Sequence, residues 1–433
     1  TCAYCGVGCG VDIQLREGKP DKISGSPEHP ANFGRLCVKG THLLDTIDLT
    51  NRLLTPEIEG VQASWDEASL KVANTFRQYI KKYGPDSVAF YVSGQMLTED
   101  YYVANKLMKG FIGSGNIDTN SRLCMSSAVS AYKRAFGEDI VPCSYEDIEQ
   151  TDVLLLVGSN AAWTHPVIYQ RIERARQVNP DYQVVVIDPR NSATTQNADL
   201  HLALKPGSDA ALFNGLLNFL NEKDRIDKTF IEDHTQDFEE ALTEAKQWPV
   251  EKVARYCDLT IEDVTKLYSL FSKSRKVVTL YSMGINQSTS GVDKCHSIIN
   301  AHLAAGKIGK SGCGPFSITG QPNAMGGREV GGLANQLTAH LDIDNTQHQD
   351  LVQTFWQSPT IATKQGAKAV DLFDQILEGK IKAVWIMATN PMVSLPNTNK
   401  VKAALEKCEF VAVSDCVASN DTLPFANVKL PAT

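Results

Sequence analysis

The sequence predicts an α/β protein in which a small, mostly β N-terminal domain precedes two Rossmann-like domains built on parallel sheets. Six short apolar runs recur along the chain, and each is followed by a polar or glycine-rich loop and a helical pattern. Strands that are apolar throughout and alternate with helices are typical of a parallel sheet covered on both faces. With 42% hydrophobic and 21% charged residues, the 433-residue chain has an ordinary globular composition. Its length predicts roughly two to four domains.

The elements follow one another in a regular order. Residues 1–55 hold short alternating stretches such as Val11–Leu15, which predict β structure. Ser64 and Glu67 have the spacing of a capping box, and the helical periodicity of residues 68–83 predicts a helix. The six apolar runs are predicted strands at 87–92, 153–157, 184–187, 277–280, 383–387 and 410–413.

The loops after these strands carry the side chains expected of a nucleotide site. They contain Ser, Asn, Asp, Gln and Arg, and they follow the strands, where open α/β sheets bind ligands. No loop has the glycine pattern of a dinucleotide fingerprint or a P-loop, so a nicotinamide cofactor or a simple NTP is weakly supported. One such loop is usually a plain connection. Six in one chain favour a large ligand with several phosphates.

Composition limits the classes of partner. The net charge of −8 argues against a general nucleic-acid binder. No apolar run approaches the roughly 18 residues of a membrane span. Seven of the eleven cysteines are scattered, which suits reduced thiols in a cytoplasm. The chain starts without Met and stops at Leu430–Thr433 without a closing helix, so both ends look cut, and an upstream targeting peptide stays open.

The other four cysteines form the strongest motif. Cys2, Cys5 and Cys9 lie within eight residues, and Cys37 follows in a second glycine-flanked segment. Four thiolates so arranged can ligate a 4Fe–4S cluster. A structural zinc site remains an alternative, although zinc usually takes two short Cys pairs. A disulfide set is less suitable, because the chain is neither small nor rich in cysteine.

Two later stretches suggest a second centre. Cys124 precedes small, helix-compatible residues, and a helix N-terminus with Arg122 nearby would favour its thiolate. The plain alternative is a buried, inert cysteine. Between Gly320 and Gly332, five glycines permit close approach of a ligand, and Arg328 offers a guanidinium for an anion. The plain alternative there is a surface Arg328 paired with Glu329.

These motifs together resemble the molybdopterin oxidoreductases of the dimethyl sulfoxide reductase family, and within it the catalytic subunits of bacterial assimilatory nitrate reductases. The resemblance runs over essentially the whole chain and is most specific at 1–10, 121–128 and 320–332. It implies a 4Fe–4S cluster and a molybdenum ion held by two molybdopterin guanine dinucleotides. It also implies domains at 1–55 (cluster), 56–141 with 340–433 (first α/β), and 142–339 (second α/β). The family continues into a C-terminal β-barrel-like domain with no counterpart in the printed sequence.

The resemblance also implies roles for individual residues. Cys2, Cys5, Cys9 and Cys37 match the cluster ligands, and Cys124 matches the molybdenum thiolate. Lys39 matches a lysine between cluster and pterin. Arg328 and Met125 match residues of the substrate funnel. Positions that match cofactor contacts are Gln95, Asn120, Gly158, Ser159, Asn160, Asp188, Arg190, Gly207, Ser208, Asp209, Met283, Gln287, Asn390, Ser414 and Asp415.

The activity implied is reduction of nitrate to nitrite by oxygen-atom transfer, with electrons entering through the cluster. Expected donors are ferredoxin, flavodoxin or a NADH-oxidising flavoprotein subunit. A formate dehydrogenase of the same family is an alternative, but there a histidine typically follows the metal ligand, whereas Met125 follows Cys124 here. A periplasmic dissimilatory nitrate reductase also stays open. Cys124 and Arg328 argue against a non-catalytic electron-transfer subunit related to the large subunit of respiratory complex I.

Overall fold

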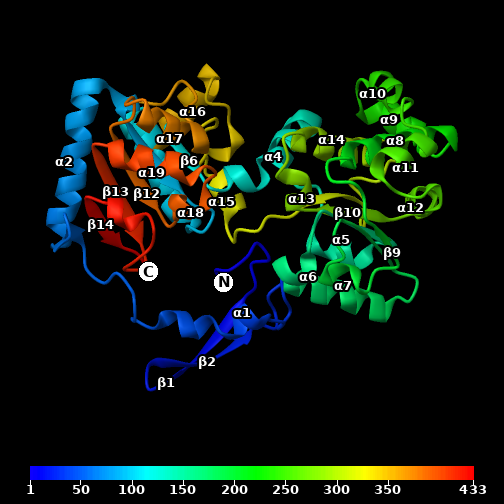
Figure 1. The fold of residues 1–433 in the computed structure, drawn as a ribbon, viewed down its shortest axis with the longest axis horizontal. Helices are drawn as coiled ribbons and strands as arrows, with labels where there is room; N and C mark the ends of the chain where they lie inside the picture. Colours follow the sequence, from blue (N-terminus) through cyan, green and yellow to red (C-terminus); the bar gives the residue numbers. More distant parts are fainter. The chain divides into compact units, whose positions relative to one another are not determined.

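The computed structural model describes residues 1–433, which form two compact units. The first contains 1–41 and 124–320, and the second contains 42–123 and 321–433. Each unit is built on its own mainly parallel sheet, so the predicted α/β class is confirmed (Figure 1). The domain limits expected from the sequence remain a prediction. No helix is both long and apolar enough to cross a bilayer.

The first unit holds a five-stranded sheet in the order β11-β10-β7-β8-β9, and all its pairings are parallel. Three of these strands coincide with the runs predicted at 153–157, 184–187 and 277–280. A separate antiparallel hairpin, β1-β2, lies near the N-terminus. The strands are β1 (Val11–Arg16), β2 (Lys19–Gly25), β7 (Val153–Val157), β8 (Gln183–Ile187), β9 (Leu200–Leu202), β10 (Val277–Tyr281) and β11 (Gly314–Ser317).

Both faces of this sheet are buried, as the continuous apolar strands require. Leu155 and Val157 pack under α4, α8, α11, α12 and α14, whereas Leu154 and Leu156 face α5 and α7 (Figure 1). The helices are α1 (Val38–Thr41), α4 (Arg122–Phe136), α5 (Tyr145–Gln150), α6 (Ala161–Thr164), α7 (Pro166–Val178), η4 (Ala193–Thr195), α8 (Asp209–Glu222), α9 (Lys228–His234), α10 (Phe238–Ala245), α11 (Val250–Cys257), α12 (Ile261–Lys273), α13 (Met283–Asn286) and α14 (Gly291–Ala304).

The second unit holds a seven-stranded sheet in the order β4-β3-β14-β13-β12-β5-β6. Strands β14 to β6 are parallel, and the two short strands at the other edge are antiparallel. Three strands coincide with the runs predicted at 87–92, 383–387 and 410–413. The strands are β3 (Glu57–Ile58), β4 (Val61–Gln62), β5 (Val88–Val92), β6 (Ile117–Thr119), β12 (Ala383–Met387), β13 (Phe410–Asp415) and β14 (Val428–Pro431).

This sheet is also covered on both faces. Val88 and Phe90 pack against α2 and α3, whereas Ala89 and Tyr91 pack against α17 and α19. The predicted capping box at Ser64 is present at the start of α2. The helices are η1 (Leu43–Ile47), α2 (Trp65–Tyr83), η2 (Pro85–Ser87), α3 (Thr98–Lys106), η3 (Leu107–Ile112), α15 (Ala324–Glu329), η5 (Thr338–His340), α16 (Thr346–Trp356), α17 (Ala369–Leu377), α18 (Pro391–Ser394), α19 (Thr398–Lys407) and η6 (Leu423–Phe425).

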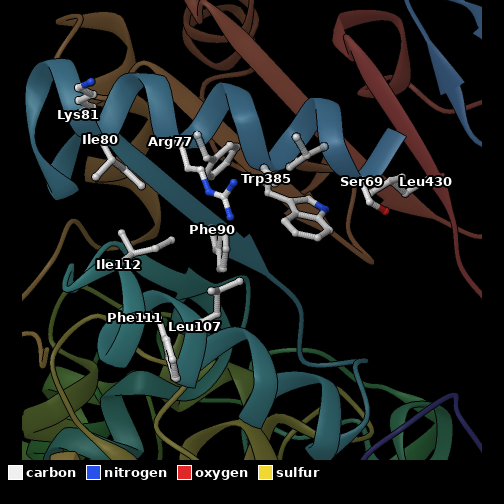
Figure 2. Close-up of a pocket in the computed structure, with 13 residues that line it drawn as sticks. Ser69, Arg77, Ile80, Lys81, Phe90, Leu107, Phe111, Ile112, Trp385 and Leu430 are labelled. Atoms are coloured by element: carbon white, nitrogen blue, oxygen red, sulfur yellow. The ribbon is translucent and has the colours of Figure 1, made fainter. Parts of the chain in front are cut away.

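An apolar groove of about 580 Å³ lies on the second unit between α2 and η3. Phe90 and Trp385 line it from strands β5 and β12, while Leu107 and Phe111 line it from η3 (Figure 2). Most of its lining side chains are apolar, and the polar ones, Ser69, Arg77 and Lys81, come from α2 (Figure 2).

Asp118 on β6 connects several segments of the second unit. Its carboxylate accepts two hydrogen bonds from Arg122, at 2.9 and 3.0 Å, and is fully buried. It also accepts from the backbone N–H groups of Ala334, at 3.2 Å, and Ala369, at 2.7 Å. One buried carboxylate therefore joins the start of α4 to two distant pieces of chain.

We predict that Asp118→Asn lowers the free energy of unfolding by about 3–5 kcal/mol, because it leaves the Arg122 charge buried without its partner. Chemical denaturation measured by circular dichroism would show this. The matched control is Asp293→Asn, which breaks an exposed 3.0 Å pair with Arg134 and should cost less than about 1 kcal/mol. Equal effects of the two substitutions would contradict the role given to Asp118.

Candidate functional site

The four N-terminal cysteines line one small cavity, together with α1 and the start of α7. A hydrogen bond from the Cys2 N–H to the Cys9 carbonyl, 2.8 Å long, closes the loop that carries three of them. Burial, together with the charges of Cys5, Cys2 and Cys37, raises the pKa of the Cys9 thiol to about 12. The four thiols are thus close enough to repel one another when ionised.

This arrangement suits a cluster better than its alternatives. All eleven cysteines are free thiols, which removes the disulfide alternative. Three of the thiols come from the segment Cys2–Cys9 and the fourth is Cys37, so the set lacks the two short Cys pairs that a structural zinc site usually takes. Four thiols around a cavity, whose thiolates repel until iron supplies positive charge, fit a 4Fe–4S group.

Two side chains hold the cysteine loop against the first sheet. The Tyr145 hydroxyl donates to the carbonyls of Gly6, at 3.0 Å, and Val7, at 3.2 Å. Arg171, which is almost fully buried, donates to the carbonyls of Pro30, at 2.8 Å, and Ala31, at 3.1 Å. Tyr145 on α5 thus binds the loop itself, and Arg171 on α7 binds the segment between that loop and Cys37.

Cys124 lies in the first turn of α4, where the helix is interrupted. Its neighbour Met125 has φ −139° and ψ 19°, outside the helical region. The Cys124 sulfur is buried, 3.3 Å from the Met283 sulfur and 3.7 Å from the Thr319 hydroxyl. Arg122, expected to favour the thiolate, has its charge balanced by Asp118.

A buried histidine connects this region with the cluster cavity. The Nε2–H of His165 donates to the Thr319 carbonyl at 2.5 Å, and Nδ1 lies 2.9 Å from the Thr164 hydroxyl. Burial lowers the pKa of His165, and the positive charge of Lys39 lowers it further. Burial raises the pKa of Cys5, and the positive charge of Lys39 opposes that rise. Lys39 thus lies close to both the cluster cysteines and His165, which the sequence pattern did not reveal.

The strand-end loops of the first unit meet at a second cavity of about 610 Å³. Nine predicted cofactor residues line it: Gly158, Ser159, Asn160, Asp188, Arg190, Gly207, Asp209, Met283 and Gln287. The tenth, Ser208, is buried, and its hydroxyl donates to the Lys205 carbonyl at 2.6 Å. Lys294, which the sequence pattern did not indicate, also lines this cavity. Its ammonium group forms an ion pair with Asp209, at 2.7 Å.

The cavity has features of a built phosphate or sugar site. A Cβ on Gly158, where φ is +54°, would lie 2.7 Å from the Gly284 Cα, so the two loops can approach only as glycines. The Ser159 hydroxyl is buried without a hydrogen-bond partner. Helix α8 begins at Asp209 on the cavity wall, and helix N-termini favour anions.

The remaining predicted contacts lie in the second unit, at the carboxyl ends of its strands. Asn120 accepts from the Gly94 N–H at 3.0 Å and donates to Thr389 at 3.1 Å, and exposed Gln95 lies in the same loop as Gly94. These contacts join the loops after β5, β6 and β12.

Three further predicted residues hold loops of this unit through their side chains. Asn390 accepts from Thr422 at 2.7 Å, and Asp415 accepts from Asn420 at 2.8 Å. Ser414 accepts a bond from the Trp385 indole at 2.9 Å. Its hydroxyl is therefore already bound to a residue that lines the apolar groove.

Arg328 also belongs to the second unit, on α15, and its side chain is buried. The plain alternative for Arg328 was an ion pair with Glu329. Glu329 instead pairs with His340, at 3.0 Å. A Cβ on Gly327 would lie 2.6 Å from the Tyr101 ring, which explains a glycine beside Arg328.

Comparisons with known proteins agree with these two centres. The molybdopterin oxidoreductase Fe4S4 domain model matches residues 1–49, and the molybdopterin oxidoreductase model matches residues 52–433. The acetylene hydratase of Pelobacter acetylenicus has the same fold, with a TM-score of 0.79 at 19% identity, covering 100% of this chain and 62% of that chain.

Several relatives that are 38% or more identical to this chain are nitrate reductases by name, and an F420-dependent formate dehydrogenase subunit alpha from Methanocaldococcus jannaschii is 31% identical. The chain is 54% identical to one from Klebsiella oxytoca and 51% identical to one from Shewanella frigidimarina, over 100% of its own length. It covers 49% and 47% of those proteins, so it spans about half their length. A periplasmic nitrate reductase from Desulfovibrio desulfuricans is 38% identical, with 100% of this chain and 60% of that protein covered. With both family models matched along nearly its whole length, the chain belongs to the molybdopterin oxidoreductases.

Proposed function

We propose that the protein reduces nitrate to nitrite as the catalytic subunit of an assimilatory nitrate reductase. The observation that carries the proposal is the buried Cys124 thiol at an interrupted helix start, in a chain 54% identical to a nitrate reductase along its full length. The balanced reaction consumes nitrate, two electrons and two protons, and it yields nitrite and water.

The residues present fit the family's cofactors. Cys2, Cys5, Cys9 and Cys37 would hold the 4Fe–4S cluster in the cavity they line. Cys124 would bind molybdenum, since a soft thiolate suits this metal. We propose that the pterin carries guanine dinucleotides, because the 610 Å³ cavity joins glycine loops, a free Ser159 hydroxyl and a helix N-terminus. When bound, the molybdenum–pterin group supplies the two-electron chemistry that removes oxygen from nitrate.

The chain's own residues then have distinct tasks. Arg328 would attract and orient the anion, because its guanidinium can bind two oxygens at once. Met125 would border the same substrate funnel and exclude water with an apolar side chain. Lys39 would stabilise negative charge between the cluster and the pterin, where added electrons pass. His165, held neutral by burial, fixes Thr319 beside the metal thiolate.

Physiological context is part of the same proposal. Eleven free thiols suit a reducing cytoplasm, and nitrate assimilation would take place there. The electron donor would be ferredoxin, flavodoxin or a NADH-oxidising flavoprotein subunit. Met125 next to Cys124 favours nitrate over formate as the substrate.

The direct test is an anaerobic assay of the complete, cofactor-loaded enzyme with reduced viologen, offering nitrate and formate in parallel. Metal analysis accompanies it. Nitrate turnover with about one Mo and at least about four Fe per chain supports the proposal. Oxidation of formate in place of nitrate reduction would make formate the substrate. A protein that contains iron but no molybdenum, and that turns over neither compound, would favour an electron-transfer subunit.

For Cys124→Ala we expect nitrate reduction to disappear while the EPR signal of the reduced cluster persists, because the substitution removes only the molybdenum thiolate. Cys408→Ala serves as the control, since that thiol contacts only the carbonyls of Lys382 and Phe410. Surviving activity in Cys124→Ala would refute the assignment of the metal ligand.

Arg328→Ala should reduce kcat/KM for nitrate by about 10- to 100-fold, the cost of one or two charge-assisted hydrogen bonds. Arg328→Lys keeps the charge but loses the two-pronged geometry, so it should recover part of the loss. Steady-state kinetics with Arg134→Ala as an exposed-site control would measure both. An unchanged kcat/KM would remove Arg328 from substrate binding.

Lys39→Ala should slow electron delivery without loss of either metal, because a cation near the path of the electrons is removed. Stopped-flow oxidation of the reduced cluster by nitrate reports this rate directly, and Lys39→Arg should retain most of it. Wild-type rates in Lys39→Ala would make the lysine a structural residue only.

A further inference from the structure

The segment that carries Arg328 is tied to a lysine with no solvent access. Lys109 is completely buried in the second unit, and its ammonium group donates to three backbone carbonyls. The acceptors are Gly331 at 2.5 Å, Leu333 at 2.8 Å and Gln336 at 2.5 Å. An ammonium has three N–H donors, so these three carbonyls use all of them.

Lys109 is placed by an unusual piece of helix. It lies on η3, a π-helical turn in which the Gly113 N–H donates to the Met108 carbonyl five residues earlier. Such turns are rare and are often found at functional sites. On the preceding turn, Asn105 donates to the Val330 carbonyl at 2.6 Å. Two residues spaced four apart therefore bind one continuous segment, 330–336.

The same segment reaches Arg328 through a side chain. Gln336 is buried, and its amide donates to the Arg328 carbonyl at 2.6 Å. The Gln336 carbonyl in turn accepts from Lys109. An unbroken path of hydrogen bonds thus runs from the lysine to the backbone of the arginine.

A lysine in this position is costly to maintain. Burial lowers the pKa of Lys109 to about 7, Asp118 raises it, and Arg122 lowers it. Unpaired burial of an ammonium is strongly unfavourable, and a buried methionine of similar length would avoid that cost. Three short carbonyl contacts are therefore better explained by a need to hold segment 330–336 than by core stability.

We propose that Lys109 is a positioning residue that, with Gln336, fixes the backbone of Arg328 for anion binding. This inference rests on the proposed role of Arg328 in nitrate binding. It adds a residue from η3 that does not itself touch the substrate. Loss of the lysine would remove one donor from each of three carbonyls, of which only that of Leu333 has another, the Gln336 N–H at 3.4 Å. It would therefore loosen the segment that aims the guanidinium.

The test compares Lys109→Met and Gln336→Ala with a matched control, Lys307→Met. Lys307 is also buried, and it donates to the carbonyls of Phe271 and Ser274 in the first unit. Each lysine substitution removes buried hydrogen bonds from an ammonium group to backbone carbonyls. Gln336→Ala removes the buried hydrogen bond from the side-chain amide to the Arg328 carbonyl. Only the first two act on the Arg328 segment.

In the loaded enzyme, Lys109→Met should raise KM for nitrate by about tenfold with kcat within about twofold, the signature of lost binding rather than lost chemistry. Gln336→Ala, a milder change, should shift KM in the same direction. Lys307→Met should leave KM unchanged even if it lowers Tm.

Hydrogen exchange gives a readout that does not depend on turnover. Amides of 324–337 should exchange faster in Lys109→Met and Gln336→Ala but at the wild-type rate in Lys307→Met. If both variants keep wild-type KM, or if exchange in this segment is unchanged, the inference is overturned. If the wild-type enzyme does not reduce nitrate, the proposed function fails, and exchange alone decides whether Lys109 fixes the segment.

Discussion

The organisation of this protein depends on two parallel sheets that are buried on both faces. Strands in such a sheet are mostly apolar, so most polar residues gather where the strands end. In the first unit, Leu154 to Leu156 supply both hydrophobic cores, and the loop from Gly158 to Asn160 opens into the cavity. The same constraint places Asn120 and Thr389 together in the second unit. The alternation of apolar strands with polar loops therefore produces both the hydrophobic cores and the cavity at the strand ends.

The N-terminal segment shows what happens where no such sheet exists. Strands β1 and β2 form a largely exposed hairpin, and the cysteine loop is packed on α5 and α7 of the first unit. Tyr145 binds carbonyls of this loop, and Arg171 binds those of the segment that leads on to Cys37. Four thiolates this close repel one another, which opposes ionisation of the thiols. A cluster would therefore stabilise this segment while using the first sheet as its support.

Sequence reasoning succeeded where the signal was local. The six apolar runs, the capping box at Ser64 and the cavity loops were predicted from periodicity and adjacent residues. It failed where contacts join distant residues. Lys109 and Gly331 are 222 positions apart, and His165 and Thr319 are 154 apart. Nothing near Lys294 indicates that it pairs with Asp209, because a lone lysine on an apolar helix has no periodic signature.

The chain passes between the two units at three places, after Thr41, after Leu123 and after Gly320. Lys39, Cys124 and Thr319 lie within two residues of these passages. On the N-terminal side of Cys124, Asp118 binds Arg122. On its C-terminal side, the Asn286 carbonyl accepts from the Ser127 hydroxyl, and the Asn286 side-chain oxygen accepts from the Ala128 N–H. A thiolate meant to hold a metal needs such restraint, because small displacements of a ligand change both affinity and potential.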